Sequence, residues 1–394
     1  MTEVLQIHPF GEGACLRKLR CLCDLCVLLR FKCFFQDDTF DTRGQSEGCK
    51  IGRGGFGVSI ERIEFQAGES KLRATPMKTT TLFDPTRRDF LKSCLSAGAS
   101  LTALAGLNPF QAQAIEPFKR PGQPRFLLSL AAYSFRDSFV DGNRGRKPNA
   151  DPNRQLDMFQ FVDYCADHGC HGAEVTSYYF PENLTDEYLL KLKRHAFWRG
   201  VEISGTAVGN TFTLPKGAKR DAEIAGVKKW IDRAQILGAP HIRVFAGNIA
   251  GGASKDDAKK LSIEALQECG DYASGKGVFL GLENHGGIVS EVDDLLDIIR
   301  AVQSAWIGIN LDSGNFHTDD PYSDLAKCAP YAVNVQFKVE MQPKGQPKQV
   351  ADLPRVMKIL REANYQGYVA LEYEAAEDPW KTVPDWLKRM KEQL

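Results

Sequence analysis

The chain has 394 residues, of which 43% are hydrophobic and 25% charged, and its 50 Lys and Arg balance its 50 Asp and Glu. These values are ordinary for a globular protein, and a formal net charge of zero excludes the strongly basic chains that bind nucleic acid through phosphate contacts. Six of the eleven cysteines fall within the first fifty residues, so the start of the chain differs in composition from the rest.

Residues 1–76 show no sustained helical or strand period. The apolar patch from Cys21 to Phe35 contains Asp24, Arg30 and Lys32, and is therefore not a membrane span. Three cysteines in this patch have half the spacing of a zinc site, but no second Cys or His pair follows them at a suitable distance. We expect a leader without regular structure, or a start codon set too early.

Residues 77–114 have the order of an export signal: a polar, basic start, an apolar stretch and a small-residue cleavage site. The stretch Thr86–Lys92 (TRRDFLK) resembles the twin-arginine export motif, Leu95–Leu107 is mildly apolar, and Ala112–Ala114 supplies the cleavage site. We expect the twin-arginine machinery as a partner, a periplasmic location and a mature chain that begins at Ile115. An amphipathic surface helix is the alternative.

After an expected linker at 115–124, short apolar runs alternate eight times with longer segments of helical period, up to Leu394. The predicted strands are Phe126–Ala132, Gly172–Thr176, Glu202–Val208, His241–Phe245, Val278–Glu283, Gly308–Asp312, Ala332–Val339 and Tyr368–Tyr373. The predicted helices are Arg154–His168, Asp186–Arg199, Arg220–Leu237, Ser254–Gly275, Glu291–Ala301, Tyr322–Cys328, Ala351–Ala363 and Asp378–Gln393. This order predicts an α/β fold with one domain at 125–394, a (β/α)8 TIM barrel. A doubly wound open sheet is the competitor, but the first strand lacks the glycine-rich phosphate loop usual there.

Three predicted strands end in carboxylates. The run Val278–Leu282 leads into Glu283, the sixth strand leads into Asp312, and the eighth leads into Glu372. In a TIM barrel the C-terminal ends of all strands face one mouth, so these three side chains are expected to converge there. Taken singly, each could instead form a salt bridge on the barrel rim.

A mouth rich in carboxylates suits one hard divalent cation. Mn²⁺ or Mg²⁺ is favoured, and Zn²⁺ or Co²⁺ is an accepted alternative because zinc also takes carboxylate oxygen. A cation held by Glu283, Asp312 and Glu372 could bind the hydroxyl and carbonyl oxygens of a sugar and stabilise an enediolate. Two glutamates on opposite sides of such a ligand could then accept and donate a proton.

Four motifs together resemble one family, the xylose isomerase-like TIM barrels. They are Gly281–His285 (GLENH), Asn310–Phe316 (NLDSGNF), Val335–Lys338 (VQFK) and Gly367–Glu372 (GYVALE). The resemblance covers Phe126 to Leu394. The family includes sugar isomerases, ketose 3-epimerases, hydroxypyruvate isomerase, inosose dehydratase and endonuclease IV, and its nuclease branch uses several more histidines and a DNA-binding face that this chain lacks.

The resemblance implies a metal held by a Glu, an Asp, a His and a Glu from the fifth to eighth strands. These positions correspond to Glu283, Asp312, Gln336 and Glu372, so Gln336 stands where the family has histidine. A neutral amide oxygen is a weaker ligand for zinc than imidazole, which favours Mn²⁺ or Mg²⁺ or weak occupancy. The change also leaves room for a barrel without catalytic activity.

The remaining polar residues of the mouth are predicted to bind substrate. His285 and His317 lie beyond ligand-bearing strand ends and could orient a hydroxyl group. Lys338 points to the same face as Gln336, where it could bind a substrate oxygen or form an ion pair with a neighbouring glutamate. The other candidates are Asn315, Arg243 and Glu174.

These observations predict a metal-dependent isomerase or epimerase of a sugar or sugar derivative, with Glu283 and Glu372 as catalytic residues. The reaction would remove a proton next to a carbonyl and pass through an enediolate. A lyase or dehydratase with the same site is one alternative, and a periplasmic carbohydrate-binding barrel without activity is another. No phosphate cradle is evident, which favours unphosphorylated sugars. Homo-oligomers are common in the family that this chain resembles.

Overall fold

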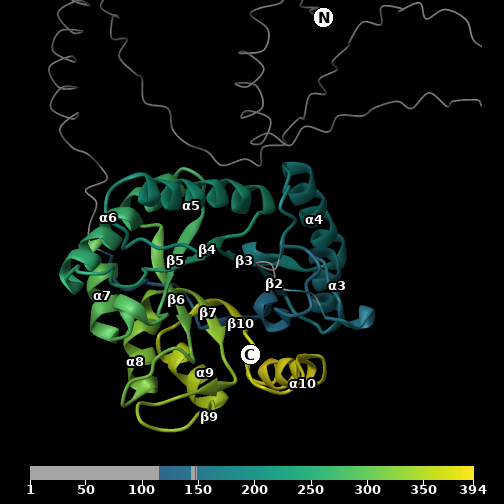
Figure 1. Ribbon diagram of the computed structural model, residues 1–394. Helices are drawn as coiled ribbons and strands as arrows, with labels where there is room; N and C mark the ends of the chain where they lie inside the picture. Colours follow the sequence, from purple (N-terminus) through teal and green to yellow (C-terminus); the bar gives the residue numbers. More distant parts are fainter. Residues whose placement is uncertain (1–114, 143–146, 148) are drawn as a thin grey trace, which may run out of the picture. The chain divides into compact units, whose positions relative to one another are not determined.

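The computed structural model describes residues 115–142, 147 and 149–394. Within them eight parallel strands close into a barrel, and helices surround the strands (Figure 1). The (β/α)8 prediction is confirmed, and closure excludes the open doubly wound sheet. The predicted leader and export signal lie outside the described residues and stay predictions.

The barrel strands pair in the closed order β1-β10-β7-β6-β5-β4-β3-β2, so every strand lies beside the strands of the neighbouring βα units. Each predicted strand lies within two residues of an observed one at both ends. The bounds are β1 Arg125–Ala131, β2 Gly172–Thr176, β3 Glu202–Ala207, β4 His241–Val244, β5 Phe279–Glu283, β6 Ile307–Asp312, β7 Ala332–Phe337 and β10 Gln366–Leu371.

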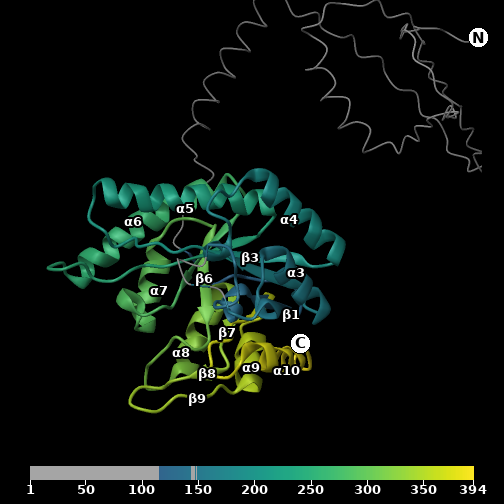
Figure 2. The same ribbon diagram turned by 45° about the vertical axis from the view of Figure 1, so that its right-hand side comes forward.

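In the described part of the chain, one α-helix follows each barrel strand. These helices, α3 to α10, lie around the outside of the barrel (Figure 2). The bounds are α3 Met158–Asp167, α4 Asp186–Arg199, α5 Ala218–Leu237, α6 Lys255–Ser274, α7 Val292–Ala301, α8 Pro321–Cys328, α9 Leu353–Glu362 and α10 Pro379–Lys391. Helix α3 begins four residues later than predicted. Its N-cap Asp157 and Gln160 form a reciprocal capping box that fixes the start, and the residues before it form a separate 3₁₀ turn at Pro152–Arg154.

The sequence did not predict a two-stranded antiparallel sheet in the loop between β7 and α9. It consists of β8 Glu340–Met341 and β9 Gln349–Val350. Two residues per strand are too short for a period of two to be recognised. The sheet matters for the site because it carries the loop that follows Lys338.

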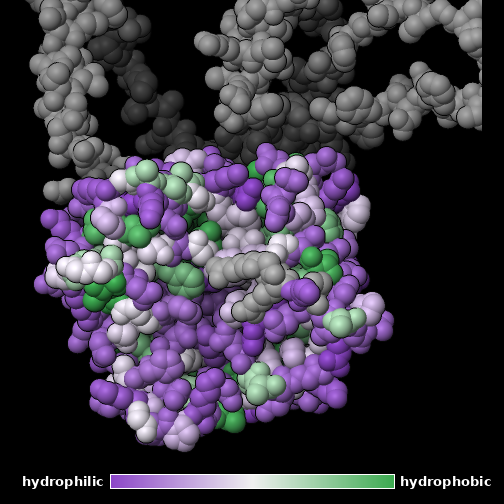
Figure 3. Space-filling view, viewed as in Figure 1, coloured by the Kyte–Doolittle hydropathy of each residue, from purple (hydrophilic) through white to green (hydrophobic). Residues whose placement is uncertain are grey.

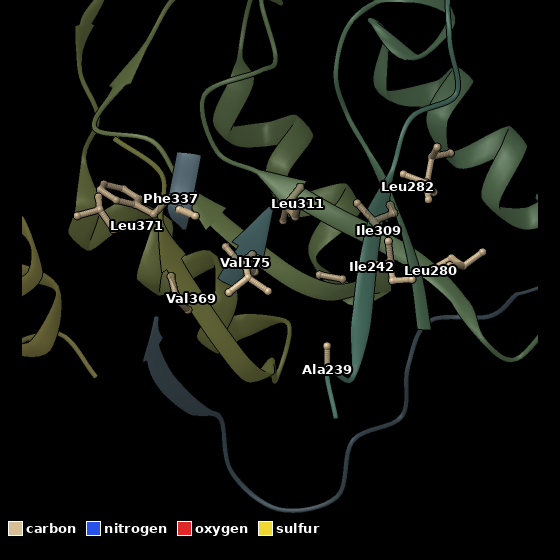
Figure 4. Close-up of a cluster of buried hydrophobic side chains, with 14 of the residues drawn as sticks. Val175, Ala239, Ile242, Leu280, Leu282, Ile309, Leu311, Phe337, Val369 and Leu371 are labelled. Carbon is tan, nitrogen blue, oxygen red and sulfur yellow. The ribbon is translucent and has the colours of Figure 1, made fainter. Parts of the chain in front are cut away.

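The strands place apolar and polar side chains on opposite faces. Successive side chains of a strand alternate between the two faces of a sheet. In β6, Ile309 and Leu311 belong to the apolar cluster drawn in Figure 4, whereas Asn310 and Asp312 make buried polar contacts inside the barrel. The apolar core thus lies between strands and helices, and the barrel interior is polar.

Residues 115–124, which were expected to be a linker, pack against the N-terminal end of the barrel. The Phe118 amide donates to the Pro330 carbonyl at 3.0 Å, and the Phe118 ring meets the Phe279 ring edge to face at 6.2 Å between centroids. The Arg125 amide at the start of β1 donates to Tyr365. This segment therefore covers the end of the barrel opposite the candidate site.

The face of the barrel drawn in Figure 3 is mostly hydrophilic, with apolar residues in small separate groups. None of the helices in the described part of the chain is both long enough and apolar enough to span a bilayer.

Candidate active site

The three predicted carboxylates lie at the mouth of the barrel, on neighbouring or nearly neighbouring strands. Glu283 and Asp312 are the last residues of β5 and β6, and Glu372 directly follows β10. Their exposed fractions are 3%, 0% and 8%. Burial of several carboxylates within one small region is unfavourable unless cations or hydrogen-bond donors compensate them.

Glu283 is compensated by the side chains around it. Its Oε2 forms an ion pair with Arg243 Nε at 3.0 Å, and its Oε1 lies 2.8 Å from His285 Nδ1 and accepts a hydrogen bond from Asn315 Nδ2 at 2.8 Å. Burial raises the pKa of Glu283, but Arg243 and His285 outweigh burial, so this pKa lies below its ordinary value. Glu283 is therefore a carboxylate at neutral pH.

Lys338 lies among the other carboxylates. Its Nζ is 3.1 Å from Asp312 Oδ2, 3.7 Å from Glu372 Oε1 and 3.0 Å from Glu374 Oε2, and it donates to Asn315 Oδ1 at 2.9 Å. Burial lowers the pKa of Lys338, but these carboxylates raise it well above its ordinary value. Of the two ion-pair partners considered for Lys338 from sequence, the structure selects Glu374; Glu340 pairs instead with Lys348.

Glu372 differs from Glu283 in its electrostatic surroundings. Burial raises the pKa of Glu372, Lys338 offsets this only partly, and the neighbouring carboxylates of Asp312 and Glu283 raise it further, so it lies well above its ordinary value. Asp312 behaves similarly, because burial raises its pKa to about 6 despite Lys338. The surroundings thus displace the pKa values of Glu283 and Glu372 in opposite directions.

The backbone around Asp312 is fixed by Asn284, which the sequence analysis did not single out. The Asn284 side chain forms two hydrogen bonds with the Asp312 backbone. Its Nδ2 donates to the Asp312 carbonyl at 2.9 Å, and its Oδ1 accepts from the Asp312 N–H at 2.9 Å. Asp312 Oδ1 in turn accepts from the Gly314 amide at 2.8 Å. Asn284 therefore determines where the end of β6 lies relative to β5.

Gln336 belongs to a buried polar network deeper in the barrel. Its Nε2 donates to Glu174 Oε1 at 2.5 Å, and its Oε1 accepts from Asn310 Nδ2 at 2.6 Å. Asn334 Nδ2 donates to Glu174 Oε2 at 2.7 Å and lies 2.8 Å from Asn310 Oδ1. Burial raises the pKa of Glu174 to about 7, although the donors from Gln336 and Asn334 partly offset this. Glu174 thus joins β2 to β7 across the barrel interior.

The sequence analysis missed Asn310 and Asn334 in this network. The signal was present, because both alternate with apolar residues on β6 and β7 and share a strand face with Asp312 and Gln336 respectively. A polar residue at such a position must find a partner inside the barrel.

Two cavities of about 200 Å³ flank the carboxylates. One is lined by Asn315, His317, Lys338 and Glu374, and the other by Phe245, Glu283 and His285 among others. His285 packs against Phe245 at 4.6 Å between ring centroids, and His317 Nδ1 lies 3.0 Å from the Gln342 carbonyl. Both predicted histidines therefore lie on the rim, His317 beside the first cavity and His285 beside the second.

A larger cavity of about 390 Å³ lies between the loops that follow β1 and β10 and includes Arg136, Arg154 and Trp380. It shares Ala375 with the cavity that contains Lys338. The two cavities therefore meet at Ala375, on the loop that follows β10.

The side chains present do not fit a divalent cation in the arrangement that the structure shows. Both oxygens of Glu283 are engaged by Arg243, His285 and Asn315. Asp312 Oδ2 faces Lys338. The only side-chain oxygen of Gln336 accepts a hydrogen bond from Asn310, and in residues 115–142, 147 and 149–394 no cluster of three His, Cys, Asp or Glu is arranged to hold a metal ion. That the four residues are ligands stays a prediction.

Comparison with known proteins identifies the family. Residues 162–390 match the model of the family described as xylose isomerase-like TIM barrel. The chain belongs to this family. The match covers β2 to α10 and so includes every candidate residue at the mouth. No curated protein matches the chain.

Several solved structures share the fold of this family member. IolI, solved with a bound zinc atom, is 18% identical, with a TM-score of 0.55 over 68% of this chain and 96% of its own. The 3-keto-D-glucoside 4-epimerase YcjR from E. coli is 17% identical, with a TM-score of 0.52 over 67% and 100%. D-psicose 3-epimerase from Clostridium cellulolyticum H10 is 16% identical, with a TM-score of 0.52 over 66% and 89%.

Proposed function

We propose that this protein is an isomerase or epimerase of an unphosphorylated keto-sugar or keto-glycoside. The observation that carries the proposal is that two glutamates buried in one mouth have different surroundings: Glu283 lies 3.0 Å from the Arg243 guanidinium, whereas Glu372 lies beside the carboxylates that surround Lys338. The pKa of Glu283 is accordingly lowered and that of Glu372 raised. An acid and a base are recognised by surroundings that displace their pKa values in opposite directions. Solved relatives of this fold include epimerases of a ketose and of a keto-glucoside, which supports the substrate class.

Glu283 is the base in this proposal. Its carboxylate takes a proton from a carbon next to the carbonyl, and the bonding electrons move onto the carbonyl oxygen to give an enediolate. Arg243 keeps Glu283 ionised before the step. Glu372, whose surroundings favour its protonated form, then returns a proton from its own side, which gives the epimer when the proton reaches the same carbon. Exchange of protons with solvent restores both glutamates.

Asn315 lies beside the substrate oxygens in this proposal, and Lys338, which keeps its carboxylate partners, supplies positive charge near them. Both line one of the two small cavities, and the ammonium of Lys338 is the nearest positive charge to an oxyanion formed there. His285 and His317 line different cavities and position hydroxyl groups in this proposal. The divalent cation predicted from the family enters none of these steps, because its ligands are engaged as described above.

Deuterium exchange tests this function. The full-length protein is incubated in D₂O with a panel of ketoses and 3-keto-glycosides, and ¹H NMR follows loss of the C–H signal and appearance of an epimer. Glu283→Gln and Glu372→Gln should each lower the rate of epimer formation by at least about 100-fold, because each removes one proton-transfer group. Glu340→Gln, a rim glutamate paired with Lys348, is the matched control. Absence of exchange with every substrate, or wild-type rates in either variant, would refute the proposal.

We also propose export by the twin-arginine pathway, on the strength of the motif around Arg87 and Arg88. Cell fractionation of a host that contains this pathway should find the protein in the periplasm. A variant with both arginines changed to lysine should remain in the cytoplasm, and a periplasmic variant would contradict the proposal.

A further inference from the structure

The most informative feature beyond the proposed reaction is the position of the Lys338 ammonium. Three carboxylates lie within 3.0–3.7 Å of its Nζ, and they come from two segments: Asp312 at the end of β6, and Glu372 and Glu374 after β10. The fourth neighbour is Asn315, whose side-chain oxygen accepts a hydrogen bond from it. Only 9% of the Lys338 side chain is exposed. The Lys338 ammonium therefore holds the surrounding segments together at this site.

Two of its carboxylate partners, Asp312 and Glu372, are residues to which the family resemblance assigns a metal ion. The remaining two assigned residues have turned to other partners, Glu283 to Arg243 and Gln336 to Glu174. Gln336 also lacks the imidazole ligand that the family has at this position. Gln336 is the one departure in residue type, and the partners of Glu283, Asp312 and Gln336 engage the oxygens that a metal ion would need.

We propose that Lys338 is the resident cation of this barrel, which holds Asp312, Glu372 and Glu374 together where its relatives are expected to hold a divalent metal. Lys338 is a positioning residue in this role. The inference rests on the geometry of the site and does not depend on which reaction the protein catalyses.

The Lys338 ammonium and a divalent metal ion exclude each other because both are positively charged. A divalent ion bound to Asp312 Oδ2 would lie within a few ångströms of the ammonium, which is 3.1 Å from the same oxygen. At such distances like charges repel strongly in a buried site, because little water is present to screen them. The ion could enter only if Lys338 left, and a buried ammonium that loses its partners bears a large desolvation cost. Metal binding and the observed lysine position are thus alternatives.

Calorimetric titration with Mn²⁺ tests this inference without any need for activity. The proteins are the chelator-washed full-length wild type, Lys338→Met, and the double variant Gln336→His with Lys338→Met, which restores the set of ligands expected in the family. Lys348→Met is the matched control, because Lys348 lines the same cavity but is largely exposed and pairs with Glu340.

We expect the double variant to bind one Mn²⁺ at least about tenfold more tightly than the wild type, with Lys338→Met in between and Lys348→Met unchanged. Mn²⁺ should also raise the Tm of both Lys338→Met proteins but not that of the wild type, since a ligand stabilises the state that it binds. Should loss of Lys338 prevent folding, Lys338→Arg keeps the charge and should bind Mn²⁺ no more tightly than the wild type. Stoichiometric micromolar binding of Mn²⁺ by the wild type, or tight binding by Lys338→Arg, would overturn the inference.

Discussion

Glu174→Gln is the substitution whose effect on stability can be worked out most fully. Glu174 is completely buried, and both of its oxygens accept hydrogen bonds, one from Gln336 and the other from Asn334. Glutamine has the same size as protonated glutamate but carries no charge at any pH. The comparison therefore isolates the cost of burying a carboxylate at this position.

The sign and size follow from the displaced pKa. Burial raises the pKa of Glu174 in the folded protein from 4.5 to about 7, so between these values the folded state holds a proton that the unfolded state has lost. Wild-type stability therefore falls as pH rises through this window, whereas below pH 4.5 the effect is absent. The interval of about 2.5 pH units, at about 1.4 kcal/mol per unit, gives a loss of about 3 kcal/mol.

Urea unfolding of the wild type and Glu174→Gln at pH 5 and pH 8 measures this effect. The free energy of unfolding of the variant, relative to the wild type, should increase by about 2–3 kcal/mol from the lower to the higher pH. Glu182→Gln, at an exposed glutamate, should show the same difference at both pH values. If the difference for Glu174→Gln were equal at pH 5 and pH 8, the account of Glu174 as a carboxylate that is costly to bury would be refuted.

Three further substitutions test neighbouring parts of the argument. Arg243→Met removes the cation that keeps the pKa of Glu283 low, so the acidic limb of the kcat/KM profile should move to higher pH; an unmoved limb would show that Arg243 has no such role. Asn315→Ala removes the hydrogen bond to Glu283 and should lower kcat at least about tenfold in the NMR assay, and a wild-type kcat would exclude this role. Gly205→Ala would place a Cβ 1.8 Å from the His241 ring inside the barrel, so thermal unfolding should show a loss of at least about 2 kcal/mol, and an unchanged Tm would contradict the packing described.

The sequence by itself determined the fold of this protein. Eight apolar runs separated by helical segments have one common solution, because parallel strands need helical crossovers and their apolar faces must be covered. The strand ends also predicted that Glu283, Asp312 and Glu372 lie at one mouth, because the C-terminal ends of TIM-barrel strands face the same way, and the structure places all three there. These inferences depend on local pattern and on the direction of the chain, both of which a sequence contains.

Only the tertiary structure decided the partners of these residues. Whether a carboxylate faces a metal, Arg243 or Lys338 depends on distances of a few ångströms between segments far apart in the chain, and sequence spacing does not report them. The position of Gln336 raised the question of a metal, but its hydrogen bonds to Glu174 and Asn310 became visible only when three strands were brought together. The sequence shows which charged residues the site contains. Their pairing and the resulting pKa values depend on the fold, because burial and proximity arise only after folding.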